Sequence, residues 1–119
     1  MIGRPAKAKI DVRVADGVAI AAIEGDMDLH VSHDLREQLM RVVNENPAMV
    51  ADLARVTGID SSGVATLLEV FQRATRRRKK FVVAAAGDSV LRVLRMARLE
   101  TIFVMSATVD EALAAARRK

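Results

Sequence analysis

Hydrophobic and polar residues alternate near the start of the chain in a way that predicts a β-hairpin. Ile10, Val12 and Val14 are separated by single charged residues, which is the period of a half-buried strand. An Asp16-Gly17 pair follows, and residues 18–23 form an uninterrupted apolar run. Asp-Gly between two apolar runs is a strong signal of a two-residue hairpin turn. We therefore expect the chain to open with two antiparallel strands.

The rest of the chain alternates between helical patterns and short apolar runs. The first helix is expected from Ser32 until Asn44-Glu45-Asn46-Pro47 stops it. Gly87-Asp88-Ser89 is expected to cap the third helix, and the last helix is expected over residues 110–118, acidic at its start and basic at its end. The strands expected between the helices are residues 48–53, 81–86 and 102–105. The apolar residues expected to face inward on the first three helices are Leu35, Leu39, Val42 and Val43, then Val64, Leu67, Leu68 and Phe71, then Val90, Leu91, Val93 and Leu94.

These elements follow one another in the order β-β-α-β-α-β-α-β-α, joined by short connections. After the hairpin, alternating strands and helices require right-handed crossovers and a largely parallel sheet. The clear alternation in the first strand favours helices packed mainly on one face of the sheet. The expected fold class is α/β, with a mixed, mostly parallel sheet that opens with a β-hairpin. We expect residues 1–8 to form a flexible N-terminal segment and residues 9–119 to form one domain.

Composition narrows the classes of protein to which the chain can belong. With 119 residues, of which 51% are hydrophobic and 29% charged, the chain is long enough for one domain with a substantial core. The absence of cysteine excludes disulfides, thiolate metal sites and a cysteine nucleophile. No apolar run approaches the roughly 18 residues of a membrane span, and the start holds no apolar block of signal-peptide length. We expect a soluble cytoplasmic protein without membrane insertion.

Net charge and catalytic motifs bear on the kind of function. A net charge of +4 suggests anionic partners, but the three aromatic residues, all Phe, are too few for a platform that stacks single-stranded nucleic acid. The sequence contains no Walker loop, no G-x-G-x-x-G motif after a strand and no G-x-S-x-G elbow. We therefore expect neither an enzyme nor a cofactor.

The segment with the clearest chemical potential is Asp60-Ser61-Ser62-Gly63, where a strand and its loop give way to a helix. Free amides of the first helical turn and the positive end of the helix dipole favour negative charge there, so a phosphate would fit, although Asp60 would oppose it. The alternative is structural: Ser61 or Ser62 caps the helix, Asp60 supplements the cap and Gly63 eases the turn. The spacing alone favours this structural alternative.

Several stretches of the sequence, taken in order, resemble a known family. Residues 51–63, with the helix at 64–77 behind them, resemble the signature of the STAS domain family, typified by bacterial anti-sigma factor antagonists. No single motif is decisive, but the order and spacing of the stretches carry the resemblance over nearly all of residues 10–116. The other matching stretches are Ile23-Glu24-Gly25-Asp26-Met27-Asp28-Leu29, Phe81-Val82-Val83 and Leu99-Glu100-Thr101-Ile102-Phe103.

The resemblance implies a binding switch that regulates transcription. In such proteins the serine directly after the Asp is phosphorylated by a cognate anti-sigma factor that is also a serine kinase of the histidine-kinase-like ATPase type. This serine corresponds to Ser61, with Ser62 in reserve. The unphosphorylated protein binds the anti-sigma factor and frees the sigma factor. Phosphorylation releases the anti-sigma factor, and a serine phosphatase resets the switch.

The resemblance also implies a docking surface around the phosphorylated serine. The family's fold places the loop after the second strand, with Asp26 and Asp28, beside the strand end that leads to Ser61. The alternative for these two aspartates is that one caps the following helix and the other is solvated. The residues expected to contact the partner are Asp26, Asp28, Asp60, Ser62, Gly63 and Val64.

The sequence departs from the family pattern in places. Val64-Ala65 stands where Leu-Gly is usual, a modest packing change that leaves the serine hydroxyls alone. Arg78 or Lys79 stands where a Gly commonly ends the second helix, so the cap there is expected to differ. His30 and His33 are also unusual, but two imidazoles at i and i+3 without a further His do not favour a metal site, and we expect none.

A run of basic residues, Arg73 and residues 76–80, ends the second helix. It could bind nucleic acid or an acidic protein, but a solvated helix end favoured by the helix dipole is the simpler interpretation. We expect no direct contact with nucleic acid. Besides the partner switch, the sequence leaves two other functions open: a non-switching STAS subunit of a transport complex or signalling scaffold, and a nucleic-acid binder acting through the basic run.

Overall fold

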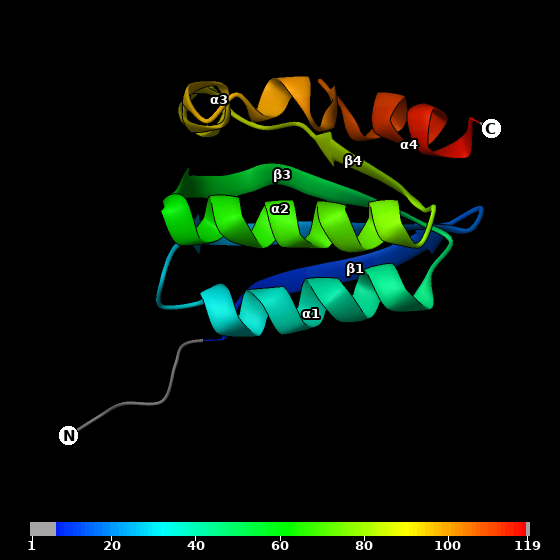
Figure 1. Ribbon diagram of the computed structural model, residues 1–119, viewed down its shortest axis with the longest axis horizontal. Helices are drawn as coiled ribbons and strands as arrows, with labels where there is room; N and C mark the ends of the chain where they lie inside the picture. The colour runs from blue at the N-terminus through cyan, green and yellow to red at the C-terminus, as the bar shows by residue number, and fades with distance from the viewer. Residues whose placement is uncertain (1–6, 119) are drawn as a thin grey trace.

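The computed structural model describes residues 7–118, which form a five-stranded sheet with helices on both faces (Figure 1). The elements are β1 (Lys9–Ala15), β2 (Val18–Met27), α1 (Ser32–Glu45), β3 (Ala48–Ile59), α2 (Ser61–Arg76), β4 (Lys80–Ala84), α3 (Asp88–Met96), the 3₁₀ turn η1 (Leu99–Thr101), β5 (Val104–Ser106) and α4 (Val109–Arg117). The strands lie side by side in chain order, from β1 to β5. β1 and β2 are antiparallel, and the later neighbours are parallel, which confirms the expected mixed, mostly parallel sheet.

The opening hairpin is confirmed. Every residue of β1 pairs with β2, from Lys9 opposite Glu24 to Ala15 opposite Val18. Between the strands, Asp16 has a φ of 50° and Gly17 a φ of 80°. Left-handed conformations at both central residues are what the favoured two-residue turn requires, because its twist matches that of the strands.

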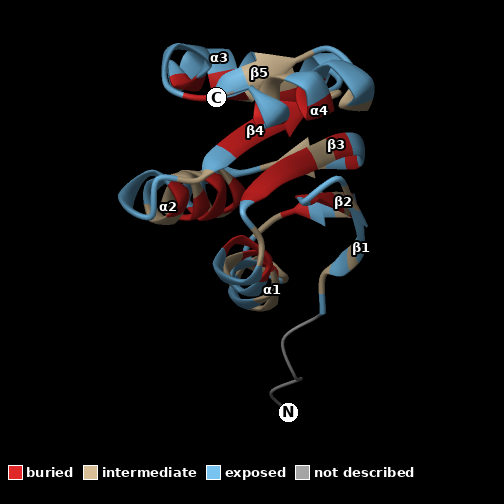
Figure 2. Cartoon of the chain, turned by 90° about the vertical axis from the view of Figure 1, so that its right-hand side faces the viewer, coloured by how far each residue is buried: buried red, intermediate tan, exposed pale blue. Residues whose placement is uncertain are grey.

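Apolar residues on the two faces of the sheet form two separate cores (Figure 2). α1, α2 and α3 cover one face, where Leu39, Leu67 and Leu94 are fully buried. α4 covers the other face and packs Leu113 against a cluster that includes Val50. Helices therefore lie mainly on one face, as expected. The four inward-facing residues predicted for α1 are all buried.

β2 and β3 are longer than the sequence predicts. β2 continues past Ile23 to Met27, and β3 continues past Leu53 to Ile59. The added halves pair with each other in parallel, with register shifts. Most of their side chains are exposed or half-buried, so the hydrophobic pattern gives no signal there, and main-chain hydrogen bonds between distant segments make the strands. As a consequence Asp26 lies in β2, which corrects its expected place in the following loop.

Two valines of β1 remain exposed, although they lie on the same face of the strand as Ile10. Val12 is 43% exposed and Val14 is 61% exposed, whereas Ile10 packs against the larger core. β1 is the edge strand of the sheet, so this apolar stripe has a neighbouring strand on one side only.

The buried face of α2 is rotated relative to the predicted one. Leu67 is buried as expected, but Val64, Leu68 and Phe71 are only partly buried. Small residues let the helix approach the sheet closely, and a pattern read from large apolar residues misses them. The buried positions are Gly63, Thr66, Leu67, Val70 and Ala74.

α2 ends in a cap with glycine-like geometry but without glycine. Arg78 has a φ of 57°, its N–H donates to the Thr75 carbonyl at 3.1 Å, and the Lys79 N–H donates to the Ala74 carbonyl at 2.8 Å. These are the paired bonds of a Schellman motif. The expectation that the cap differs is therefore wrong, because Arg78 adopts the left-handed conformation that a glycine would adopt more easily.

The elements near the C-terminus are shifted from their predicted bounds. β4 ends at Ala84, and β5 begins at Val104 instead of residue 102, because η1 precedes it. Gly87 is the N-cap of α3 without a side-chain hydrogen bond, and Leu91 on that helix is only partly buried. Val93 is also only partly buried, so two of the four predicted inward residues of α3 lie at the margin of the core.

The structure describes only the last two residues of the expected N-terminal segment. Residues 1–6 of the segment 1–8 are not among those described. The Ala8 N–H donates to Asp34 Oδ2 at 2.8 Å, and Gln38 Nε2 donates to the Ala8 carbonyl at 3.1 Å, so this residue is held to α1. Across residues 7–118, each helix is too short or too polar to span a bilayer.

Candidate functional site

The start of α2 is capped by the side chain of Asp60. Asp60 Oδ1 accepts the N–H of Ser62 at 2.9 Å and the N–H of Gly63 at 3.1 Å. The Asp60 carbonyl accepts the Val64 N–H at 3.0 Å. Asp60 is therefore the N-cap, which corrects the interpretation that Ser61 or Ser62 forms it. It also corrects the expectation that these amides are free for a phosphate, because a carboxylate already holds them.

Asp60 also joins α2 to the loop after β2. Its Oδ2 accepts the Leu29 N–H at 3.2 Å, and its own N–H donates to the Met27 carbonyl at 3.1 Å. The loop therefore lies against the helix start, as expected. The Ser62 hydroxyl, which donates to Asp60 Oδ1 at 2.5 Å, is the main cause that lowers the pKa of Asp60. Desolvation opposes this effect on the pKa, and the amides of Gly63, Ser62 and Leu29 lower the pKa further, so Asp60 is charged at neutral pH.

The two serines at the helix start differ in their surroundings. Ser62 is half-buried, and its hydroxyl is engaged by Asp60. Ser61 is exposed, and the side-chain hydrogen bonds found within residues 7–118 do not involve its hydroxyl. Ser61 is therefore available at the surface, whereas the Ser62 hydroxyl is held by Asp60.

Gly63 brings the helix start into close contact with the end of β2. A Cβ at this position would lie 2.4 Å from the Met27 carbonyl oxygen and 2.8 Å from Ile59 Cγ1. Thr66, one turn later, is buried, and its hydroxyl donates to the Ser62 carbonyl at 3.0 Å. Gly63 is buried, so its part in the site is to let α2 approach β2 and thereby to position Ser61.

Asp26 and Asp28 are each bonded close to the strand ends, and neither caps α1. Asp26 Oδ1 accepts the Thr57 hydroxyl at 2.6 Å, which joins β2 to β3. Asp28 Oδ1 accepts the His30 N–H at 3.0 Å within the loop. The N-cap of α1 is Val31, without a side-chain hydrogen bond, so the alternative that one aspartate caps this helix is wrong. The sequence offered no signal for the Thr57 contact, because it depends on the unexpected second half of β3.

The fold thus brings three carboxylates to one end of the sheet. Asp26 and Asp28 lie at and just beyond the C-terminal end of β2, and Asp60 follows the C-terminal end of β3. Ser61 is exposed beside Asp60. Val64 belongs to the same helix start but is partly buried against the core, so it contributes less surface than expected.

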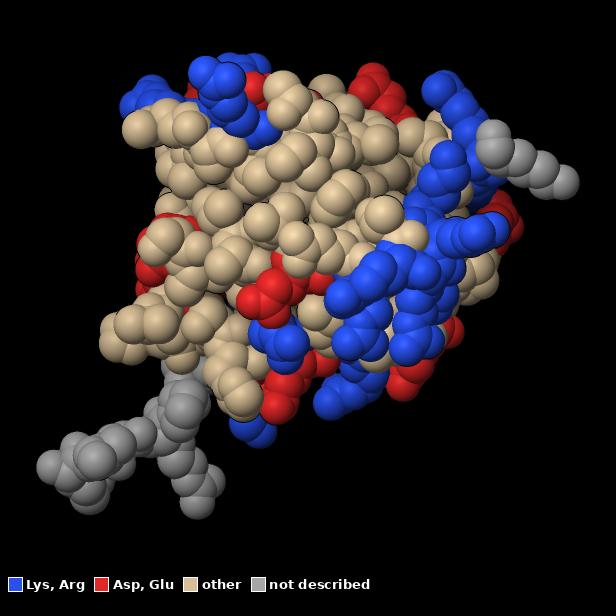
Figure 3. All heavy atoms as spheres, in the orientation of Figure 1, with Lys and Arg blue, Asp and Glu red and all other residues tan. Residues whose placement is uncertain are grey.

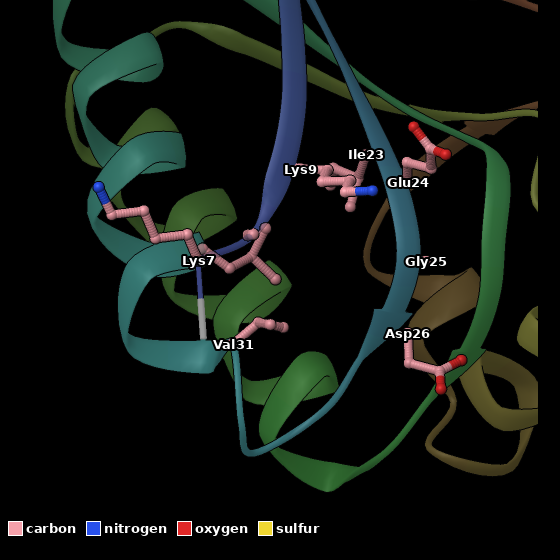
Figure 4. Close-up of a pocket in the computed structure, with 9 residues that line it drawn as sticks. Lys7, Lys9, Ile23, Glu24, Gly25, Asp26 and Val31 are labelled. Atoms are coloured by element: carbon pink, nitrogen blue, oxygen red, sulfur yellow. The ribbon is translucent and has the colours of Figure 1, made fainter. Parts of the chain in front are cut away.

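A surface pocket lies next to Asp26, between the starts of β1 and α1 and the end of β2 (Figure 4). Apolar side chains of Ile23, Val31 and Leu35 line it together with charged residues from β1 and β2. Gly25, with a φ of 90°, also lines it and lies at a register shift between β2 and β3. The pocket gives the acidic end of the sheet a hollow with a partly apolar lining.

The His33 side chain does not join this site. His33 Nε2 pairs with Glu37 Oε1 at 3.1 Å on the exposed side of α1. In the part of the chain that the structure covers, there is no group of three His, Cys, Asp or Glu side chains able to hold a metal ion.

The basic run lies at the other end of α2 from Ser61. Figure 3 shows Lys and Arg atoms gathered on the right of the molecule, where α2 ends in Figure 1. Two of these cations bond to the end of α1: Arg73 Nη1 donates to Asn44 Oδ1 at 3.2 Å, and Lys79 Nζ donates to the Val43 carbonyl at 2.7 Å. The basic run and the acidic end of the sheet are therefore separate surfaces.

Comparison with known proteins agrees with the fold. The model of the STAS domain family matches residues 9–112. The anti-sigma-F factor antagonist RsfB of Mycobacterium tuberculosis is 34% identical over 111 residues, which cover 91% of this chain and 90% of RsfB. An anti-sigma factor antagonist from Mycobacterium paratuberculosis has a crystal structure with a TM-score of 0.87 and 27% identity, covering 98% of this chain and 100% of that one.

A third protein of similar fold has been solved in two chemical states. The anti-sigma factor antagonist SpoIIAA in its unphosphorylated form has a TM-score of 0.78 at 18% identity, covering 92% of this chain and 96% of that one. The phosphorylated form of the Bacillus protein has a TM-score of 0.70, covering 92% of this chain and 99% of that one. At this identity the likeness concerns the fold. Because the family model spans residues 9–112 and RsfB is similar along nearly the whole chain, the protein belongs to the STAS domain family.

Proposed function

We propose that the protein is an anti-sigma factor antagonist that regulates transcription by partner switching. The unphosphorylated chain binds an anti-sigma factor that is also a serine kinase of the histidine-kinase-like ATPase type. Phosphorylation of Ser61 releases this partner, and a serine phosphatase restores binding. The protein is a regulatory binding protein of the cytoplasm and not an enzyme. The descriptions of RsfB and of the Mycobacterium paratuberculosis protein support the first part of this proposal.

One observation carries the proposal: an exposed serine hydroxyl beside a charged carboxylate that already caps the helix. A phosphate on Ser61 adds about 1.5 to 2 negative charges at neutral pH. Asp60 occupies the amides of Ser62 and Gly63, so the new charge gains no such partners and faces Asp60. Within a docked interface this charge must also be stripped of water, which makes the phosphorylated complex unfavourable.

Electrostatic repulsion supplies a large part of the free energy that such a switch requires, and steric exclusion supplies the rest. Shifting a two-state equilibrium from 1:99 to 99:1 requires about 5.5 kcal/mol of differential binding. Opposing one buried charged contact in an interface costs about 2 to 5 kcal/mol, and the added volume of the phosphate contributes further. The domain therefore needs no refolding to release its partner.

The docking surface we propose is the acidic end of the sheet. It comprises Asp26, Asp28, Asp60 and Ser61, together with Ser62 and Val64 where they reach the surface. The adjacent pocket would accept an apolar side chain of the partner, since Ile23, Val31 and Leu35 line it. We expect the kinase to bind the acidic end of the sheet through a basic, partly apolar surface, because opposite charges across an interface are complementary.

Phosphorylation tests the proposal directly. The full chain is incubated with ATP and the histidine-kinase-like ATPase that co-purifies with it from its native cell, and the modified residue is mapped by mass spectrometry. We expect label on Ser61 and none on Ser61→Ala. Label on neither Ser61 nor Ser62, or co-purification of a transporter ATPase alone, contradicts the partner switch and supports a permanent scaffold subunit.

Binding of charge variants tests the switch without the kinase reaction. Ser61→Ala should keep the affinity of the unphosphorylated chain, and Ser61→Asp should weaken binding by about 2 kcal/mol or more. Ser89→Asp is a matched control, because Ser89 is also an exposed serine in the first turn of a helix, on α3. Equal affinities of Ser61→Asp and Ser89→Asp, measured by calorimetry, would remove Ser61 from the mechanism.

A further inference from the structure

β1 forms an open edge of the sheet. Within residues 7–118 it pairs with β2 alone, so one side of its backbone has no partner strand. Figures 1 and 2 show β1 at the border of the sheet, and its side chains Val12 and Val14 are 43% and 61% exposed. A long edge strand with exposed apolar residues is a template for pairing with a further strand.

The hairpin determines which residues of β1 direct backbone groups outward. In a two-residue hairpin, the pair that flanks the turn, here Ala15 and Val18, exchanges both of its hydrogen bonds, and bonded pairs alternate from there. The odd-numbered residues of β1 therefore direct N–H and C=O toward β2. The even-numbered residues, Ile10, Val12 and Val14, direct theirs to the open side. A second strand can accept these bonds without disturbing the hairpin.

We propose that β1 pairs antiparallel with β1 of a second copy of this chain, centred on Val12, to form a homodimer. In this register each Asp11 faces Arg13 of the second copy, so two oppositely charged pairs form on one face of the sheet. On the other face Val12 lies opposite Val12 of the second copy, and Ile10 lies opposite Val14 of the second copy. The exposed valines are thereby covered by apolar residues.

Charge selects this register over its neighbours. A register centred on Asp11 would place Asp11 opposite Asp11 of the second copy and Lys9 opposite its Arg13. A register centred on Arg13 would place the two Arg13 side chains opposite each other. Like charges directly opposite destabilise a strand pair. Centred on Val12, all seven residues of β1 are paired. Asp11 and Arg13 then occupy non-hydrogen-bonded positions, where opposite side chains approach most closely.

The rest of the fold is compatible with this pairing. Ile10 is opposite Ile23 of the larger core, so the new apolar stripe lies on the face covered by α1, and one α1 from each copy flanks it. The other edge strand, β5, has only three residues and offers much less backbone. The two-fold axis is perpendicular to the sheet, so the Ser61 ends of the two copies point in opposite directions. Ser61 is not part of the dimer interface, and the dimer does not depend on the proposed function.

Sedimentation equilibrium of the full chain, from about 10 μM to about 1 mM, tests the dimer. Asp11→Arg and Arg13→Asp each convert both symmetric charge pairs into like-charge pairs, and each should weaken association about tenfold or more. The double variant restores opposite charges in the same register and should regain the dissociation constant within about threefold. Both residues are exposed, and thermal melting followed by circular dichroism checks that each variant is folded.

A cysteine cross-link provides a second measurement. The chain has no cysteine, so Val12→Cys introduces one thiol per copy at the two-fold axis. The facing Cα atoms would lie about 5.5 Å apart, within the range of a disulfide. Val104→Cys, at a 54% exposed position on the other edge strand, is the control. Mild oxidation should give a covalent dimer of the first variant and not of the second.

The outcomes separate clearly. A wild-type dimer that each single charge reversal weakens and the double variant restores supports the proposal, as does selective cross-linking at position 12. A chain that is monomeric at about 1 mM overturns it. A dimer that is insensitive to both single reversals, or equal cross-linking of the two cysteine variants, also overturns it because association then uses another surface.

Discussion

Gly63→Ala tests whether close contact between α2 and β2 supports the site. A Cβ at residue 63 would lie 2.4 Å from the Met27 carbonyl oxygen, 2.8 Å from Ile59 Cγ1 and 2.9 Å from Met27 Cβ. The first distance is about 1 Å shorter than an ordinary contact. The nearest atom belongs to the backbone of a paired strand, so the helix start must move instead. Asp60 and Ser61 would move with it.

The cost follows from two opposing effects. Overpacking a buried contact costs about 1 to 3 kcal/mol, and alanine is favoured over glycine in a helix by about 1 kcal/mol at most. We expect a net loss of about 1 to 2 kcal/mol in the free energy of unfolding. With a urea m-value of about 1 to 3 kcal/mol/M, the midpoint should fall by roughly 1 M. Phosphorylation of Ser61 should also slow, because the hydroxyl is displaced.

The matched control is Gly87→Ala at the N-cap of α3. Nothing lies within 4 Å of a Cβ at Gly87, so this substitution changes cap preference alone and should cost at most about 1 kcal/mol. Urea unfolding of both variants, followed by circular dichroism, measures the difference. A Gly63→Ala chain that is as stable as Gly87→Ala would refute the view that this contact positions the helix.

Three further results are expected. Asp60→Ala should lower the free energy of unfolding by about 1 to 2 kcal/mol in urea, since the amides of the α2 start lose their cap, and a loss below 0.5 kcal/mol would speak against that role. Arg78→Gly should raise the free energy of unfolding by about 1 kcal/mol, because glycine adopts the left-handed conformation of residue 78 without strain. An unchanged melting curve would show that Arg78 is not strained. The pKa values of Asp34, lowered chiefly by the Ala8 amide, and of Asp60, lowered chiefly by the Ser62 hydroxyl, lie below the ordinary 3.8. The stabilisation that these two carboxylates give the folded chain is therefore complete above about pH 5 and is lost as the pH falls through their folded-state pKa values. In the double variant Asp34→Asn, Asp60→Asn, the free energy of unfolding should fall less between pH 5 and pH 2 than in the wild type, as measured by urea unfolding at each pH.

Local signals in the sequence predict most of the fold. The Asp16-Gly17 turn, the stop at residues 44–47 and the apolar face of α1 each depend on residues close together in the chain. These elements are predicted correctly because turn preferences and helical periodicity act over a few residues. The same holds for the contiguous part of the candidate site, residues 60–63, which the sequence places at a helix start.

Other features of the site depend on residues that are distant in the sequence. The Thr57 hydroxyl reaches Asp26 only because the second halves of β2 and β3 pair, and these halves lack a hydrophobic pattern. The need for glycine at residue 63 arises from Met27, which belongs to another strand. Residue spacing cannot show either contact, since both depend on how the chain returns to itself.

The amino-acid sequence is enough to predict the order of strands and helices, the position of the hairpin and the serine-containing helix start. Only the folded chain shows that Asp60 is the cap, that the Ser62 hydroxyl is engaged while Ser61 is exposed, and that three carboxylates share one end of the sheet. Side-chain patterns report burial along one element, whereas caps, strand pairing and close contacts are formed by backbone groups of segments far apart in the chain.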